Sequence, residues 1–228
     1  MLHDAIDDGD IEKVRTLLAN PQIDINEPIP TYLENGRRTP LFFAMRGDIE
    51  CFRLLVRDPR LNVNTCGPNA PTPLNIALQG DVERTLLLLL HPNIYVNREL
   101  YAALEFGGPC LPFLLKHNRL NVNQFTLHRL ALNRYNPSTE LFLTHPNLNI
   151  NLKFHGKHPL DVALYYNPKL AELLLDDPNL DHPFVCDISI LSRAGSVKYR
   201  NLAITCLLLV PQISRHLWLL IFSLPRRV

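Results

Sequence analysis

The sequence predicts an all-α solenoid of about seven helix-turn-helix repeats with projecting finger loops. Three observations carry this prediction: a proline-containing phrase that recurs along the chain, a Gly-Asp-x-Glu segment upstream of it, and apolar residues at helical spacing between the two. The chain has 228 residues, of which 46% are hydrophobic. It can therefore bury a continuous core, and we expect no extensive disorder.

The recurring phrase consists of two bulky apolar residues, two spacers, usually proline, and often an apolar-x-apolar-Asn ending. It reads LLANPQIDIN, LVRDPRLNVN, LLLHPNIYVN, LLKHNRLNVN and FLTHPNLNIN, with weaker copies in LLDDPNLDHP and LLLVPQI. The residues in the proline position are Pro21, Pro59, Pro92, Asn118, Pro146, Pro178 and Pro211. The steps between them are 38, 33, 26, 28, 32 and 33 residues, which indicates a helical repeat of about 33 residues.

The second helix of a repeat is predicted to begin after the Gly-Asp-x-Glu segments at Gly9, Gly47 and Gly80. Glycine suits the left-handed residue that ends one helix, aspartate suits the cap of the next, and glutamate complements the helix dipole. Apolar residues at spacings of three, three and one then form a single stripe. In the first copy they are Ile11, Val14, Leu17 and Leu18.

The first helix of a repeat reads TPLFFAMRG from Thr39, TPLNIALQG from Thr72 and HPLDVALYY from His158. Proline suits a helix start because its missing amide hydrogen is not needed there. The fourth repeat lacks this opening and carries Gly107-Gly108-Pro109 before Pro112, so its second helix should be short. The fifth and seventh repeats are predicted largely from the period.

These residues resemble the ankyrin family, whose T-P-L-H-x-A opening, glycine-containing turn and closing apolar-Asn finger they match along almost the whole chain. The match is most specific where Thr39-Pro40-Leu41 with Ala44 returns 33 residues later as Thr72-Pro73-Leu74 with Ala77. The resemblance implies an ankyrin-repeat solenoid. It also implies a protein partner that lies against the fingers and the concave row of first helices.

The predicted array covers residues 1–213, and a C-terminal capping helix and tail cover residues 214–228. The approximate repeats are 1–26, 39–64, 72–97, 99–123, 125–151, 158–183 and 185–213. Within the tail, Leu217–Phe222 are six apolar residues that no single helical stripe can bury. We favour a helix that packs its apolar residues on the last repeat. The alternatives are that this helix docks on a partner or a second copy, or that the chain continues in a longer protein. A membrane-surface role ranks fourth.

The candidate partner-binding residues come from two long fingers, the first helices and the tail. Tyrosine and arginine on Glu27–Arg38 are typical interface anchors, although a tolerated insertion explains this finger equally well. Arg46 and Gln79 follow the alanines of two first helices, and Leu152–Lys157 forms the second long finger. The candidates are Tyr32, Glu34, Arg37, Arg38, Arg46, Gln79, Phe154, His155 and Trp218.

Composition argues against several other classes of protein. Lys and Arg total 23 against 22 for Asp and Glu, so we expect neither nucleic acid nor an anionic membrane as a partner. Five widely spaced cysteines without a C-x-x-C pair indicate reduced thiols and a cytoplasmic location. The acidic amino terminus shows no Sec-type signal, and Pro211, Arg215 and His216 interrupt the most apolar region, so we predict no transmembrane segment.

No catalytic, cofactor-binding, small-molecule or metal-binding residues are predicted. The chain has no H-x-x-x-H or H-E-x-x-H spacing, phosphate loop or nucleophile elbow. His91, His117 and His145 recur before the repeat loop, so we expect them to be surface residues of the repeat. We expect His128, at the T-P-L-H position, to form a hydrogen bond in the turn.

The sequence therefore favours a monomeric protein-protein interaction module. Its divergent repeats and their fingers are similar in style to those of ankyrin arrays that some intracellular bacteria deliver into host cells. This similarity suggests a host protein as partner and export by a non-Sec route. The alternative is a targeting or regulatory fragment of a longer enzyme. A third hypothesis is a degenerate enzyme that uses a Cys-His pair.

Overall fold

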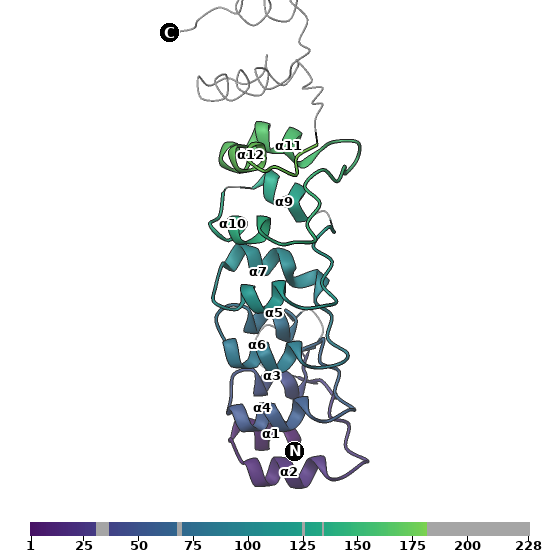
Figure 1. Cartoon of the computed structure of the whole chain (residues 1–228). Helices are drawn as coiled ribbons and strands as arrows, with labels where there is room; N and C mark the ends of the chain where they lie inside the picture. Colours follow the sequence, from purple (N-terminus) through teal and green to yellow (C-terminus); the bar gives the residue numbers. More distant parts are fainter. Residues whose placement is uncertain (31–36, 68–69, 125, 134, 182–228) are drawn as a thin grey trace, which may run out of the picture. The chain divides into compact units, whose positions relative to one another are not determined.

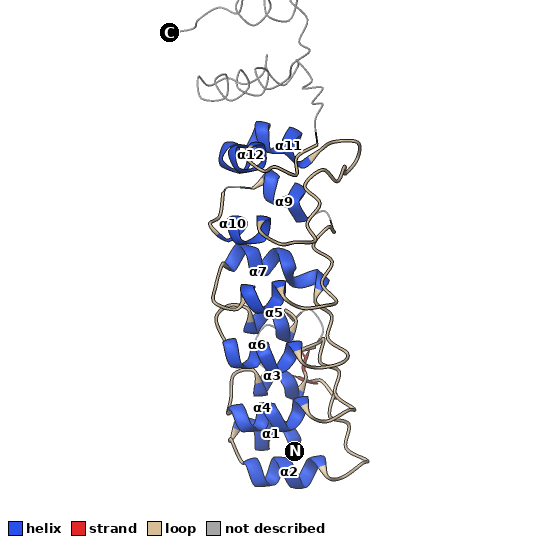
Figure 2. Ribbon diagram, viewed as in Figure 1, coloured by secondary structure: helices blue, strands red, loops and turns tan. Residues whose placement is uncertain are grey.

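The computed structural model describes residues 1–30, 37–67, 70–124, 126–133 and 135–181 (Figure 1). Within these residues the chain forms twelve short α-helices, one 3-10 helix and a two-stranded hairpin (Figure 2). The all-α solenoid prediction is confirmed. The described residues group into two compact units, the first within residues 1–124 and 136–145 and the second within residues 126–135 and 146–181.

The first unit is built from consecutive helix pairs. They are α1 (Leu2–Asp7) with α2 (Ile11–Leu18), α3 (Pro40–Ala44) with α4 (Ile49–Val56), α5 (Pro73–Ala77) with α6 (Val82–Leu89), and α7 (Leu100–Phe106) with α8 (Leu111–Leu115). η1 (Asn97–Glu99) precedes α7, and α10 (Ser138–Leu143) packs on α7 and α8. Because helices this short are marginal alone, packing between pairs stabilises them: α1 contacts α3, and α4 contacts both α2 and α6.

The second helices begin as the Gly-Asp-x-Glu segments predict. The Asp10, Asp48 and Asp81 side chains cap α2, α4 and α6 by accepting backbone N–H bonds. Gly9 has the expected left-handed backbone, with φ of 69°. The same expectation is wrong for Gly47, which has no positive φ; a Cβ there would lie 3.3 Å from the carbonyl oxygen of Phe43, so close packing is the physical reason for glycine.

The first helices also begin as expected, with Pro40, Pro73 and Pro159 in the first turn of α3, α5 and α11. The short second helix expected in the fourth repeat is α8, which has five residues. In α4 the predicted stripe is largely buried, with Phe52, Leu55 and Val56 inside. In α2 only Val14 of the corresponding stripe is buried, because this helix belongs to the terminal pair.

The second unit contains α9 (Thr126–Leu132), α11 (Pro159–Tyr166) and α12 (Pro168–Leu175), and α11 packs on both others. Buried Asn167 joins them: its Oδ1 caps α12 at Leu170, and its Nδ2 donates to the carbonyl oxygens of Leu130 and Asn133. The predicted fifth repeat is thus divided, with α9 in this unit and α10 in the other. The predicted seventh repeat and capping helix lie outside the described residues.

Candidate protein-binding surface

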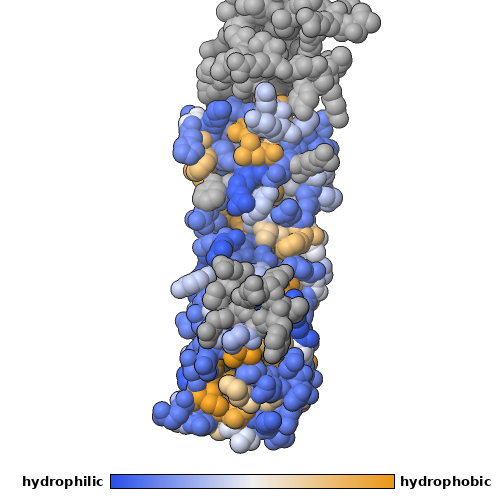
Figure 3. Space-filling view, turned by 180° about the vertical axis from the view of Figure 1, so that it is seen from behind, coloured by the Kyte–Doolittle hydropathy of each residue, from blue (hydrophilic) through white to orange (hydrophobic). Residues whose placement is uncertain are grey.

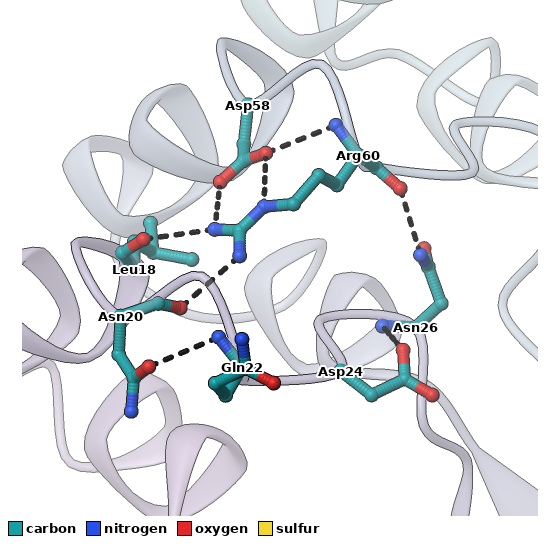
Figure 4. Close-up of polar contacts among 7 residues, drawn as sticks. All are labelled: Leu18, Asn20, Gln22, Asp24, Asn26, Asp58 and Arg60. Carbon is teal, nitrogen blue, oxygen red and sulfur yellow. Dashed lines mark hydrogen bonds and ion pairs between the residues drawn. The ribbon is translucent and has the colours of Figure 1, made fainter.

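In three of the repeats, the asparagine that ends the repeat phrase hydrogen-bonds its finger to the finger of the next repeat. Asn26 Nδ2 donates to the carbonyl oxygen of Arg60 at 2.8 Å, a bond drawn in Figure 4, and Asn26 Oδ1 accepts from the amide of Asn62 at 2.7 Å. The same pair of bonds recurs from Asn64 to Asn93 and Tyr95, and from Asn151 to Asn179 and Asp181. These asparagines therefore fix the spacing of the fingers and are not free to bind a partner.

Arginine side chains form a second set of bonds between repeats. Arg60 donates to the carbonyl oxygens of Leu18 at 2.8 Å and Asn20 at 3.1 Å, while Asp58 holds its guanidinium at 2.6 Å (Figure 4). The hydrogen bond from Arg60 lowers the pKa of Asp58 below its ordinary value. Arg119 donates in the same way to the carbonyl oxygens of Pro92 at 2.6 Å and His91 at 3.2 Å.

The histidines before the repeat loop have structural roles that the sequence did not predict. The expectation that His91 is a surface residue is wrong, because it is only 6% exposed, and its Nδ1 accepts the amide of Asn93 at 3.1 Å. His117 and His145 are half-buried, and their Nε2 atoms lie 3.2 Å and 3.0 Å from the carbonyl oxygens of Leu89 and Leu115. Burial between consecutive repeats, which no local pattern encodes, explains the difference.

The first-helix side of the amino-terminal repeats carries a cluster of aromatic and cationic side chains. Arg38 and Arg46 place their guanidinium groups 5.1 Å and 4.8 Å from the centroid of the Phe42 ring. Phe43 meets Phe42 edge-on at 5.7 Å and lies 6.2 Å from the ring of His3. We call Arg38, Phe42 and Arg46 the Phe42 cluster. Figure 3 shows hydrophobic side chains gathered among hydrophilic ones at this end of one face.

Two of the candidate residues, Arg38 and Arg46, are thus brought together on the ring of Phe42. Arg38 lies on β2 (Arg37–Arg38), which pairs antiparallel with β1 (Ile29–Pro30) at the base of the first long finger. Gln79 is exposed just after α5 and takes no part in the cluster. Tyr32, Glu34 and Trp218 lie outside the described residues, as does the side chain of Arg37. The sequence reasoning missed Phe42, because it resembled an ordinary member of an apolar helix.

The second long finger, Leu152–Lys157, projects from the second unit. Phe154 and Lys157 form a backbone bridge, and Phe154 and His155 are exposed with their rings 4.3 Å apart. His128 Nε2 lies 2.9 Å from the carbonyl oxygen of Lys157, so the expected hydrogen bond of His128 in the turn is present. This arrangement joins the two candidates Phe154 and His155 on one rigid turn.

The cysteines of the described chain are suited to packing and not to nucleophilic chemistry. Cys51, Cys66 and Cys110 are free and buried. Burial raises the pKa of the Cys66 thiol to about 12 and also raises that of Cys51, so both are protonated at neutral pH. Cys206 and Cys186 lie outside the described residues. Across the described chain, no group of three His, Cys, Asp or Glu side chains is placed to hold a metal ion.

A comparison with protein families places these repeats. The family model for ankyrin repeats (three copies) matches residues 2–99, which hold α1 to α6 and η1. This part of the chain is therefore similar to three ankyrin repeats in sequence as well as in its helix pairs. No curated protein matches it. Ankyrin repeats are protein-protein interaction modules, and no helix in the part of the chain that the structure describes is long and apolar enough to cross a membrane.

Proposed function

We propose that this protein binds a protein partner through the first-helix side of its amino-terminal repeats, centred on the Phe42 cluster. One observation carries the proposal: two arginines, predicted as partner-binding residues for separate reasons, stack on one aromatic ring. The finger Glu27–Arg38 adjoins this cluster through β2, since Arg38 belongs to both.

The cluster has the physical properties of an interface centre. A guanidinium over an aromatic ring is attracted to the ring face and keeps its N–H donors at the edges. Arg46 is exposed and forms no ion pair with any described residue, so its charge is available to a partner. Because stacking already restricts the arginine side chains, less rotamer entropy is lost when a partner binds. Arginine and aromatic side chains dominate binding energy in many interfaces.

The class of partner is proposed from the repeat sequences and the cysteines. The similarity in style to arrays that intracellular bacteria deliver into host cells favours a host protein as partner. The free, buried thiols of Cys51, Cys66 and Cys110 are compatible with a reducing compartment such as the host cytoplasm. We propose that the protein acts there as a monomer, after export by a non-Sec route.

A pull-down from host-type cell lysate with quantitative mass spectrometry tests the proposal. The variants are Arg46→Ala and the combined Tyr32→Ala, Arg37→Ala and Arg38→Ala, and the matched control is Arg57→Ala, an exposed arginine at the end of α4. We expect one specific partner to be lost from both variants and retained by the control, with unchanged helical circular dichroism. Retention by both variants, or the absence of any specific partner, would contradict the proposal.

A further inference from the structure

The finger Leu152–Lys157 is closed by a tight turn of one conformation. The amide of Phe154 donates to the carbonyl oxygen of Lys157 at 2.9 Å, and the amide of Lys157 donates to that of Phe154 at 3.1 Å. Between them, His155 and Gly156 have φ angles of 49° and 76°. Two successive positive φ angles are typical of a two-residue hairpin turn. Such a turn fixes the direction of its side chains.

The turn is also fastened to the helix beneath it. His128 on α9 is only 6% exposed, and its Nε2 lies 2.9 Å from the carbonyl oxygen of Lys157. The ring of Phe154 lies 5.6 Å from the His128 ring and meets His155 edge-on. The finger is therefore held before any partner arrives, which reduces the entropy that binding must overcome.

The exposed side chains of this finger combine positive charge with apolar surface. Lys153, His155 and Lys157 are exposed, while Leu152 and Phe154 are 41% and 42% exposed. No ion pair joins either lysine to a described residue, and the finger itself contains no acidic residue. The nearby Asp161 accepts the amide of His158 at 2.9 Å, at the start of α11. The finger is thus a rigid basic and apolar surface without an internal counter-charge among the described residues.

We propose that this finger binds an acidic peptide segment that also carries an apolar side chain. The carboxylates would lie at Lys153 and Lys157, and the apolar side chain would pack on Phe154. Exposed ion pairs are individually weak, so the charges mainly select and orient the segment while the apolar contact holds it. The inference rests on the proposed protein-binding function, but it uses a surface of the other compact unit.

Selection from a phage-displayed random peptide library on the full chain tests this inference. The peptides selected are synthesised, and their binding is measured by fluorescence anisotropy with the wild type and with Lys153→Gln/Lys157→Gln. These substitutions leave the backbone bonds of Lys157 in place. The matched control is Lys13→Gln/Lys116→Gln, which removes the same charge from two exposed positions in the first unit. Circular dichroism checks that every variant keeps its helices.

We expect the selected peptides to be acidic with at least one apolar residue. Their affinity should fall about tenfold in the finger variant and remain within about twofold in the control. It should also fall as ionic strength rises from about 0.01 to about 0.15 M, since the Debye length shortens from about 30 to about 8 Å. Phe154→Ala should weaken binding without changing this salt dependence.

Several outcomes overturn the inference: no enrichment of acidic peptides, equal binding to wild type and finger variant, or equally tight binding of a single-stranded oligonucleotide. Arg46→Ala separates the two proposals. If it abolishes peptide binding while the finger variant does not, the Phe42 cluster binds the peptides and this inference fails. If the lysate yields no partner but the acidic peptides still require the lysines, the inference stands and the function proposed above fails.

Discussion

The second and fourth repeats fasten their fingers to the preceding repeat at equivalent backbone atoms but with different side chains. In the second repeat, Asp58 accepts the amide of Arg60 at 3.0 Å, and the guanidinium of Arg60 reaches back to the carbonyl oxygen of Leu18. In the fourth repeat, His117 accepts the amide of Arg119 at 3.3 Å. His117 itself then reaches the carbonyl oxygen of Leu89, the equivalent of Leu18.

The difference teaches that the same backbone carbonyl oxygen is bound by an arginine paired with a carboxylate in one repeat and by an imidazole ring in the other. Arg60 is neutralised by Asp58, and both remain charged near neutral pH. In the fourth repeat, Nδ1 of His117 accepts the amide of Arg119, and Arg119 has no ion-pair partner among the described residues. At the same junction, burial lowers the pKa of His91, whereas the equivalent position of the first repeat holds Asn20, so the amino-terminal junction should tolerate acid better than the one between the third and fourth repeats.

Of the three changes, removing Arg60 should reduce the stability of the fold most. Arg60→Ala loses two hydrogen bonds to carbonyl oxygens and leaves Asp58 without its partner, so we expect the free energy of unfolding to fall by about 2 kcal/mol. Urea denaturation followed by circular dichroism measures the change. Arg57→Ala, an exposed neighbour on the same turn, should stay within about 0.5 kcal/mol of wild type. Equal stabilities of the two variants would contradict the assigned role of Arg60.

Replacing His117 by asparagine should separate its two roles. Asn20 already performs the turn role in the first repeat, where its Oδ1 accepts the amide of Gln22 at 3.0 Å. His117→Asn should keep that turn bond but lose the bond to the carbonyl oxygen of Leu89, because the side chain is shorter. We expect a loss of about 1 kcal/mol in the free energy of unfolding, measured by urea denaturation. A loss as large as that of Arg60→Ala would show that His117 does more than supply one bond.

Local chemistry explains which parts of the structure the sequence could predict. The caps at Asp10, Asp48 and Asp81 and the proline starts of the first helices depend on residues within one turn, so the pattern shows them. The bonds of Asn26 and Asn64 join residues about thirty positions apart, and the recurrence of asparagine was their only signal. The same limit applies to the proposed site.

The Phe42 cluster and the burial of His91 depend on how neighbouring segments meet. Arg38 and Arg46 were candidates for separate reasons, and only the packing of β2 beside α3 brings both to one ring. His91 was expected on the surface because polar residues in loops usually are exposed. It is buried where the next repeat covers it and supplies Arg119 as a bonding partner.

Of the three changes, lowering the pH should reduce the stability of the fold least. Replacing His91 should show which residue causes this reduction. Burial first, and the charge of Arg119 second, hold the pKa of His91 below its ordinary value of 6.5. As pH falls below about 6.5, the unfolded chain binds a proton at this position that the folded chain resists, so stability decreases until pH reaches the lower folded pKa. The lowered pKa of Asp58 acts only at more acidic pH, below its ordinary value of 3.8.

Between pH 7.5 and 5, His91→Asn should therefore flatten the decrease in melting temperature, whereas Asp58→Asn should lower stability at every pH without flattening it. An unchanged pH profile in His91→Asn would place the acid sensitivity elsewhere in the array.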